Sequence, residues 1–159
     1  MSKILVAYFS VGGMTRIVAE NLVQASGADL FEIVPEQPYV EADLNWELEV
    51  CRTRDEMNDK NSRPAIKSKI EDISQYSHVF IGFPIWLYRE PSIIDTFMES
   101  YDWTGITVIP FCTSGGSDIG DSGKNMAALG KGAKVLEGRR LSGLTTEDDL
   151  KKWLEQILA

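Results

Sequence analysis

The feature that most constrains the fold is an alternation between short apolar runs and segments with helical spacing. The apolar runs lie at residues 4–9, 30–34, 79–83, 107–111 and 133–136. Short apolar runs bounded by glycine, proline or polar residues are typical of strands buried on both faces. Strands that alternate with helices predict a parallel sheet with right-handed crossovers. The sequence therefore predicts a doubly wound α/β domain over residues 1–159.

Apolar residues with helical spacing lie between these runs. They predict helices at residues 14–26, 66–76, 92–101 and 123–129, and a last helix that follows Thr146. Gly27 is the predicted stop of the first helix, and Ser122 and Thr146 are predicted N-caps. The helices then cover both faces of the sheet, in a three-layer sandwich.

Residues 35–64 do not follow the alternation, and we call them the excursion. Prolines lie near both of its ends, and its middle is polar and charged. Residues 41–60 could hold one helix, with Leu44, Leu48, Cys51 and Met57 roughly on one side. Tyr39 and Trp46 argue against a flexible linker, because both side chains are costly to leave in water. The excursion either covers the sheet or roofs a pocket, with Tyr39 or Trp46 inside it.

Composition narrows the function classes. The formal net charge is −8, which argues against nucleic acid and anionic membrane surfaces as partners. Cys51 and Cys112 have no metal-binding spacing, and His78 is the only histidine, so no metal site is expected. The first apolar run is too short for a signal peptide or a membrane span, which favours the cytoplasm.

Ligands of such sheets bind outside the carboxyl ends of the strands, so the loops after the strands carry the chemistry. The first loop, residues 10–15, combines glycines and hydroxyls before a helix, which suits a phosphate but equally suits a plain turn. The second, residues 84–91, offers Trp86 and Tyr88 as stacking partners for a planar ring. The third, residues 113–118, has small residues and hydroxyls that can wrap a polar ring edge.

These loops resemble the flavodoxin-like family, in its short-chain bacterial branch with a Thr-Ser-Gly-Gly-Ser third loop. The resemblance rests on Tyr8-Phe9-Ser10 with Gly13 and Thr15, on Gly82-Phe83-Pro84-Ile85-Trp86, and on residues 110–117. It covers essentially the whole chain. It implies a five-stranded parallel sheet of order 2-1-3-4-5 with FMN at the switch between strands 1 and 3, for which flavodoxin is a standard example.

The resemblance assigns the FMN contacts loop by loop. The implied phosphate residues are Ser10, Gly12, Gly13, Met14 and Thr15. The implied flavin residues are Pro84, Ile85, Trp86, Leu87 and Tyr88, followed on the other side of the ring by Thr113, Ser114, Gly115, Gly116 and Ser117. Gly12 and Met14 stand where the family has a hydroxyl and an amide, and each lost hydrogen bond weakens FMN binding by roughly tenfold or more.

The family also has a glycine near the reactive edge of the flavin, whose peptide flips on reduction. Tyr88 stands at that position and Arg89 follows it. Residues other than glycine seldom adopt positive φ, so the flip should be costly. Two-electron chemistry should then be favoured over one-electron chemistry.

The expected function is electron transfer by an FMN-binding flavodoxin-like protein, with a redox protein or a small molecule as the partner. One alternative is an FMN-dependent oxidoreductase that uses NAD(P)H and a quinone-type acceptor. Another is a regulatory module whose flavin site has decayed. A phosphorylated receiver domain is excluded, because Ser10 and Phe83 stand where it needs acidic residues.

Overall fold

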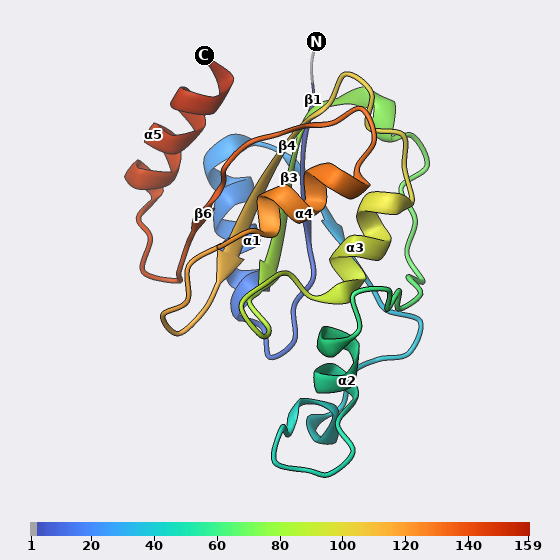
Figure 1. Ribbon diagram of the computed structural model, residues 1–159. Coiled ribbons are helices and arrows are strands. Elements are labelled where there is room, and N and C mark those ends of the chain that lie inside the picture. Colours follow the sequence, from blue (N-terminus) through green and yellow to red (C-terminus); the bar gives the residue numbers. More distant parts are fainter. Residues whose placement is uncertain (1–2) are drawn as a thin grey trace.

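The computed structural model describes residues 3–159, in which one parallel sheet forms the centre (Figure 1). Its strands are β1 (Lys3–Tyr8), β2 (Asp29–Glu32), β3 (Tyr76–Pro84), β4 (Thr107–Thr113), β5 (Lys134–Val135) and β6 (Arg139–Arg140). Their order is β2-β1-β3-β4-β5, and β6 also pairs with β4. All pairings are parallel. The predicted order 2-1-3-4-5 is confirmed.

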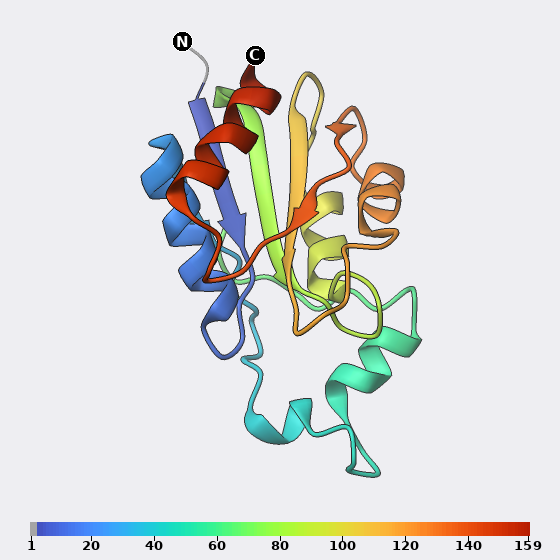
Figure 2. The same ribbon diagram turned by 90° about the vertical axis from the view of Figure 1, so that its left-hand side faces the viewer.

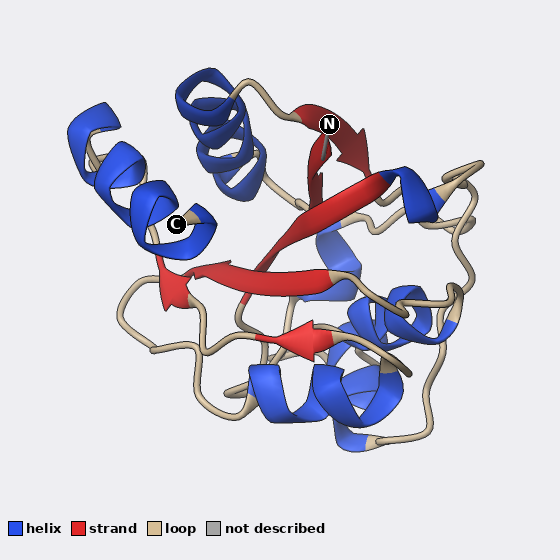
Figure 3. Cartoon of the chain, turned by 90° about the horizontal axis from the view of Figure 1, so that it is seen from above, coloured by secondary structure: helices blue, strands red, loops and turns tan. Residues whose placement is uncertain are grey.

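Helices cover both faces of the sheet, as Figure 3 shows from above. The helices that flank it are α1 (Met14–Ser26), α3 (Ser92–Glu99), α4 (Ser122–Leu129) and α5 (Glu147–Leu158). The face under α1 and α5 buries Tyr8 and Phe80 against Leu22 and Trp153. The opposite face is covered by α3 and α4 and has the other core cluster. Because successive strand residues point to opposite faces, Val79 and Phe80 belong to different clusters. The three-layer sandwich is confirmed.

The predicted helix ends agree with the structure in two places and differ in a third. Gly27 ends α1 in the left-handed conformation, with its N–H donated to the Val23 carbonyl. Thr146 caps α5, because its hydroxyl accepts the Asp149 N–H. The prediction for Ser122 is wrong: it is the first residue of α4 and follows the cap residue Asp121, and its buried hydroxyl has no partner among the described residues.

The prediction of a helix at residues 66–76 is also wrong. Ile66 forms an antiparallel bridge with Pro35, and the Lys67 N–H donates to the Val34 carbonyl. Residues 34–36 and 65–67 therefore pair with each other at the base of the excursion. Backbone groups used in this pairing are not available for the hydrogen bonds of a helix. Only a 3-10 turn, Ile73–Gln75, precedes β3. That strand begins earlier than predicted and includes His78.

The single helix predicted for residues 41–60 is divided. A 3-10 turn, Glu41–Leu44, and a short helix, α2 (Arg52–Asn58), are separated by irregular chain. Arg54 fixes that chain by donating to the carbonyls of Trp46 and Glu49. Figures 1 and 2 show the excursion extending beyond the carboxyl edge of the sheet, not lying over a face.

The fifth strand is interrupted opposite Pro110 of β4. Pro110 has no N–H to donate to a neighbouring strand. Gly138 lies against it with φ 76°, and a Cβ there would lie 2.1 Å from the Pro110 carbonyl oxygen. The predicted strand at residues 133–136 is therefore the shorter β5, and β6 resumes the pairing at Phe111 and Cys112.

Candidate functional site

Three loops meet at the carboxyl edge of the sheet, where the strand order reverses between β1 and β3. They follow β1, β3 and β4, and the excursion projects from the same edge (Figure 2). The loops are tied together, since the Ile85 N–H of the second donates to the Thr113 carbonyl at 3.2 Å. The residues that the sequence suggests as contacts of FMN all lie in these three loops, and the structure brings the loops to this edge.

The first loop presents unused backbone donors at the start of α1. Gly12 and Gly13 have φ of 87° and 96°, which glycine adopts without strain. The N–H groups of Gly12, Gly13, Met14 and Thr15 have no hydrogen-bond acceptor among residues 3–159, whereas the Arg16 N–H donates to the Ser10 hydroxyl at 3.2 Å. Successive free N–H groups at a helix N-terminus attract an anion.

The Thr15 side chain contacts the third loop. Its hydroxyl is 2.7 Å from the hydroxyl of Thr113, and both residues are buried. This hydrogen bond joins the first loop to the third. The Thr15 side chain therefore holds the two loops at a fixed separation, and its backbone N–H has no acceptor among residues 3–159.

The second loop contains a tight turn at residues 86–89. Two hydrogen bonds between Trp86 and Arg89, at 3.0 and 3.2 Å, close it around two central residues. Its central residues, Leu87 and Tyr88, have φ of 49° and 69°. A turn with positive φ at both central residues favours Asn-Gly, and left-handed backbone costs other residues roughly 1–2 kcal/mol each. Tyr88 therefore already has the positive φ that is costly for residues other than glycine, and the expected effect on flavin chemistry stays a prediction.

The aromatic residues of the second loop differ in availability. The Trp86 ring packs edge-on against Phe9 and Tyr39, with ring centroids 5.6 and 5.4 Å apart. Tyr88 is 80% exposed. Tyr88 is thus the freer stacking surface, while Trp86 is held between the sheet and the excursion.

The third loop is open and is shaped by a few contacts of its own. The Ser114 hydroxyl donates to the Ser117 carbonyl, and Arg140 of β6 donates to the Gly116 carbonyl at 3.2 Å. Gly115 and Gly116 are exposed, and a Cβ at either would meet nothing within 4 Å. A planar group can therefore approach this backbone closely.

A buried charged cluster beneath the second loop was not predicted from the sequence. Glu90 and Asp95 are 1% and 4% exposed, and Asn125 of α4 donates to Glu90 at 3.1 Å. Burial, a hydrogen bond with Glu90 and the charge of Glu90 raise the pKa of Asp95 to about 8, although Arg89 and Arg63 oppose the rise. The sequence does contain a signal, since Asp95 follows Ile93 and Ile94 within an apolar helix.

Cys112 and His78 take no part in this edge's exposed surface. Cys112 is fully buried at the end of β4, and burial raises the pKa of its thiol to about 12. The thiol therefore stays protonated and packs as a small apolar side chain. His78 lies near the amino end of β3, away from the three loops.

Comparisons with known proteins agree with this geometry. The family profile named Flavodoxin matches residues 3–157. A candidate flavoprotein from Bacteroides eggerthii is 48% identical, over 100% of this chain and 99% of its own, with a TM-score of 0.93. One from Bacteroides uniformis is 41% identical, over 97% and 98% of the two chains, with a TM-score of 0.89.

A more distant flavoprotein from Lactobacillus acidophilus, solved in complex with FMN, is 21% identical over 97% of this chain and 99% of its own. Its TM-score of 0.70 shows a shared fold. No curated protein matches the sequence significantly. Among residues 3–159, none of the helices has both the length and the apolar character needed to cross a membrane. The strand order, the three loops and the profile match together show that the chain belongs to the flavodoxin family.

Proposed function

We propose that the protein binds FMN at the carboxyl edge of its sheet and takes part in electron transfer with it. The observation that carries the proposal is the row of free N–H groups at Gly12, Gly13, Met14 and Thr15. They form a site for one phosphate, and the loop has no second glycine motif for a pyrophosphate. The distant relative solved with FMN supports the same choice of flavin.

The residues present fit this cofactor. Ser10 and the first-loop N–H groups would hold the phosphate, and the Thr15–Thr113 hydrogen bond would keep the first and third loops apart by a fixed distance. Pro84, Ile85, Leu87 and Tyr88 would border the ring on one side, with the third loop on the other. FMN itself supplies the chemistry, because it accepts and donates one or two electrons.

A direct test is to purify the protein, denature it and identify any released flavin by chromatography. The proposal predicts FMN, in an amount approaching one per chain after incubation with excess FMN. A protein that remains colourless after this incubation would instead support the regulatory module with a decayed site.

A second candidate, an FMN-dependent oxidoreductase, is favoured by one cavity. About 650 Å³ of space adjoins the second loop, lined by Tyr88, Arg89, Asn125 and, from the excursion, Lys60 and Arg63. An enzyme needs such space for a second reactant, whereas a carrier needs only an exposed flavin edge. Anaerobic stopped-flow mixing of the FMN-loaded protein with NADH, NADPH and quinones separates the two. Rapid reduction by a nicotinamide would favour the enzyme.

A further inference from the structure

We propose that the excursion clamps the 86–89 turn in its left-handed conformation, with Arg89 as the positioning residue, and so fixes the backbone that this turn presents to the flavin. The turn lacks the glycine that its conformation favours, since Leu87 and Tyr88 both have positive φ. Such a conformation persists only where surrounding contacts impose it. Those contacts come from both ends of the turn.

Arg89 holds one end. Its guanidinium donates to the Met57 carbonyl of α2 at 3.1 Å and to the Glu90 carbonyl at 3.2 Å. It also lies 3.4 Å from Asp95 of α3. A planar guanidinium has several donors in fixed directions, so it can join α2, α3 and the turn in one arrangement. Its side chain is only 16% exposed, which strengthens these contacts.

Tyr39 holds the other end through Trp86. Its ring contacts those of Trp86 and Phe9, and its hydroxyl donates to Glu56 at 2.6 Å. Arg52 lies over the same ring at 3.7 Å. Tyr39, Arg52 and Glu56 all belong to the excursion. Both ends of the turn are therefore held by the excursion, which a simple cover for the sheet does not require.

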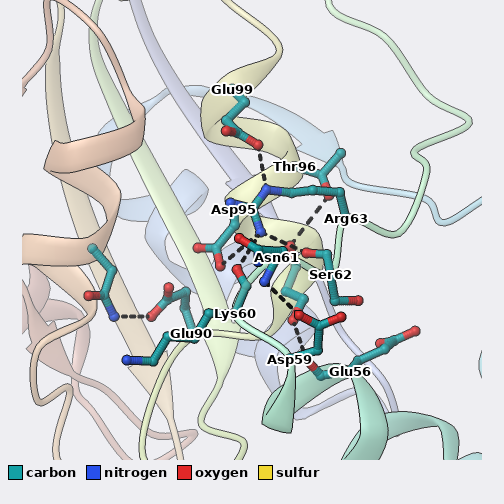
Figure 4. A network of polar contacts seen from close by, with 12 residues as sticks. Glu56, Asp59, Lys60, Asn61, Ser62, Arg63, Glu90, Asp95, Thr96 and Glu99 are labelled. Carbon is teal, nitrogen blue, oxygen red and sulfur yellow. Dashed lines mark hydrogen bonds and ion pairs between the residues drawn. The ribbon is translucent and has the colours of Figure 1, made fainter.

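Arg63 provides a matched control within the same cluster. Figure 4 shows it beside Asp95 and Glu99 of α3. It lies 3.9 Å from Asp95 and also pairs with Glu99, but it makes no hydrogen bond to the 86–89 turn. Replacing Arg63 removes one positive charge near Asp95, as replacing Arg89 does, and leaves the clamp in place.

The decisive measurement is amide hydrogen exchange at Trp86 and Arg89 in the flavin-free protein, because these N–H groups close the turn. We expect Arg89→Gln to speed their exchange by about tenfold, which corresponds to roughly 1.4 kcal/mol. Arg63→Gln should leave it unchanged. Adding Leu87→Asn and Tyr88→Gly to Arg89→Gln should restore slow exchange, because Asn-Gly forms this turn without a clamp. If Arg89→Gln does not fold, Arg89→Lys is used instead, because lysine keeps the positive charge but lacks the several fixed donors of the guanidinium.

The clamp would be refuted by unchanged exchange in the Arg89 variant, by equal losses in both arginine variants, or by failure of the Asn-Gly rescue. Its effect on the flavin rests on the proposed function. Arg89→Gln should weaken FMN and riboflavin binding by the same factor, about tenfold, because the turn faces the ring and not the phosphate. If the unmutated protein binds no flavin, the proposed function fails, and amide exchange still decides whether the clamp exists.

Discussion

The first and second loops reach left-handed backbone in opposite ways. In the first, positive φ falls on Gly12 and Gly13, which adopt it without strain. In the second, it falls on Leu87 and Tyr88, and distant residues impose it. The first conformation is therefore local and built into its own sequence, whereas the second depends on the excursion. Variants at these loops should differ accordingly.

The largest effect on FMN affinity is expected at Gly13. A Cβ at Gly13 or at Gly115 would meet nothing within 4 Å, but only Gly13 has positive φ. Gly13→Ala should lower the free energy of unfolding by roughly 1–2 kcal/mol and should turn the free N–H groups away from one another. FMN affinity should fall by at least about tenfold. Gly115→Ala is the control for stability in urea denaturation, and equal losses in the two variants would contradict a conformational cause.

Thr15→Val tests the joint between the first and third loops. The substitution leaves the buried Thr113 hydroxyl without its partner, which should cost roughly 1–3 kcal/mol of unfolding free energy. Riboflavin and FMN binding should both weaken, since the loop spacing changes. The double variant Thr15→Val/Thr113→Val should lose less stability than the sum of the single variants. Strict additivity would show that the hydroxyl pair does not couple the loops.

Asp95→Asn tests whether the stability of the second loop depends on pH while that of the first does not. Residues 10–15 of the first loop contain no titratable side chain, whereas the second rests on Asp95, whose pKa is raised from 3.8 to about 8. The folded state holds that proton more tightly than the unfolded state. Its contribution to stability is therefore complete below about pH 4 and is lost as pH rises toward about 8.

Asp95→Asn should flatten this decline in unfolding free energy between pH 4 and pH 8. Asp102→Asn is the control and should leave this range nearly unchanged, because hydrogen bonds from Thr104 lower the pKa of that exposed carboxyl, whose contribution to stability is lost only as pH falls below about 4. If the unmutated protein instead gains stability steadily over this range, and the Asp95 variant behaves in the same way, the buried carboxyl pair does not set the pH dependence of stability.

The smallest effect is expected for Tyr88→Gly. Glycine adopts positive φ without strain, but it also increases the conformational freedom of the unfolded chain. The net gain in unfolding free energy should therefore stay below about 1 kcal/mol. Because Tyr88 is already left-handed at 80% exposure, one-electron reduction should depend less on this residue than the sequence suggests. Photoreduction of both proteins measures it, and a large change in the amount of one-electron-reduced flavin would restore the original expectation.

The sheet and the first loop were predictable because their signals are local. Apolar runs predict the strands, and Gly12 and Gly13 before an amphipathic helix predict the tight turn into α1. The break opposite Pro110, the pairing of Pro35 with Ile66 and the left-handed Tyr88 all depend on partners distant in sequence. Periodicity does not contain such information. The buried Asp95 was missed for the same reason, since its partners come from a loop and the excursion.

If the first loop binds the phosphate of FMN, calorimetric titration of flavin-free protein with FMN and with riboflavin should separate the two ligands. Two charge-assisted hydrogen bonds of roughly 1.5–3 kcal/mol each correspond to a ratio of about a hundredfold or more. FMN should bind more tightly than riboflavin by at least that factor. Equal affinities would contradict the assignment of the free N–H groups at Gly12, Gly13, Met14 and Thr15 to a phosphate.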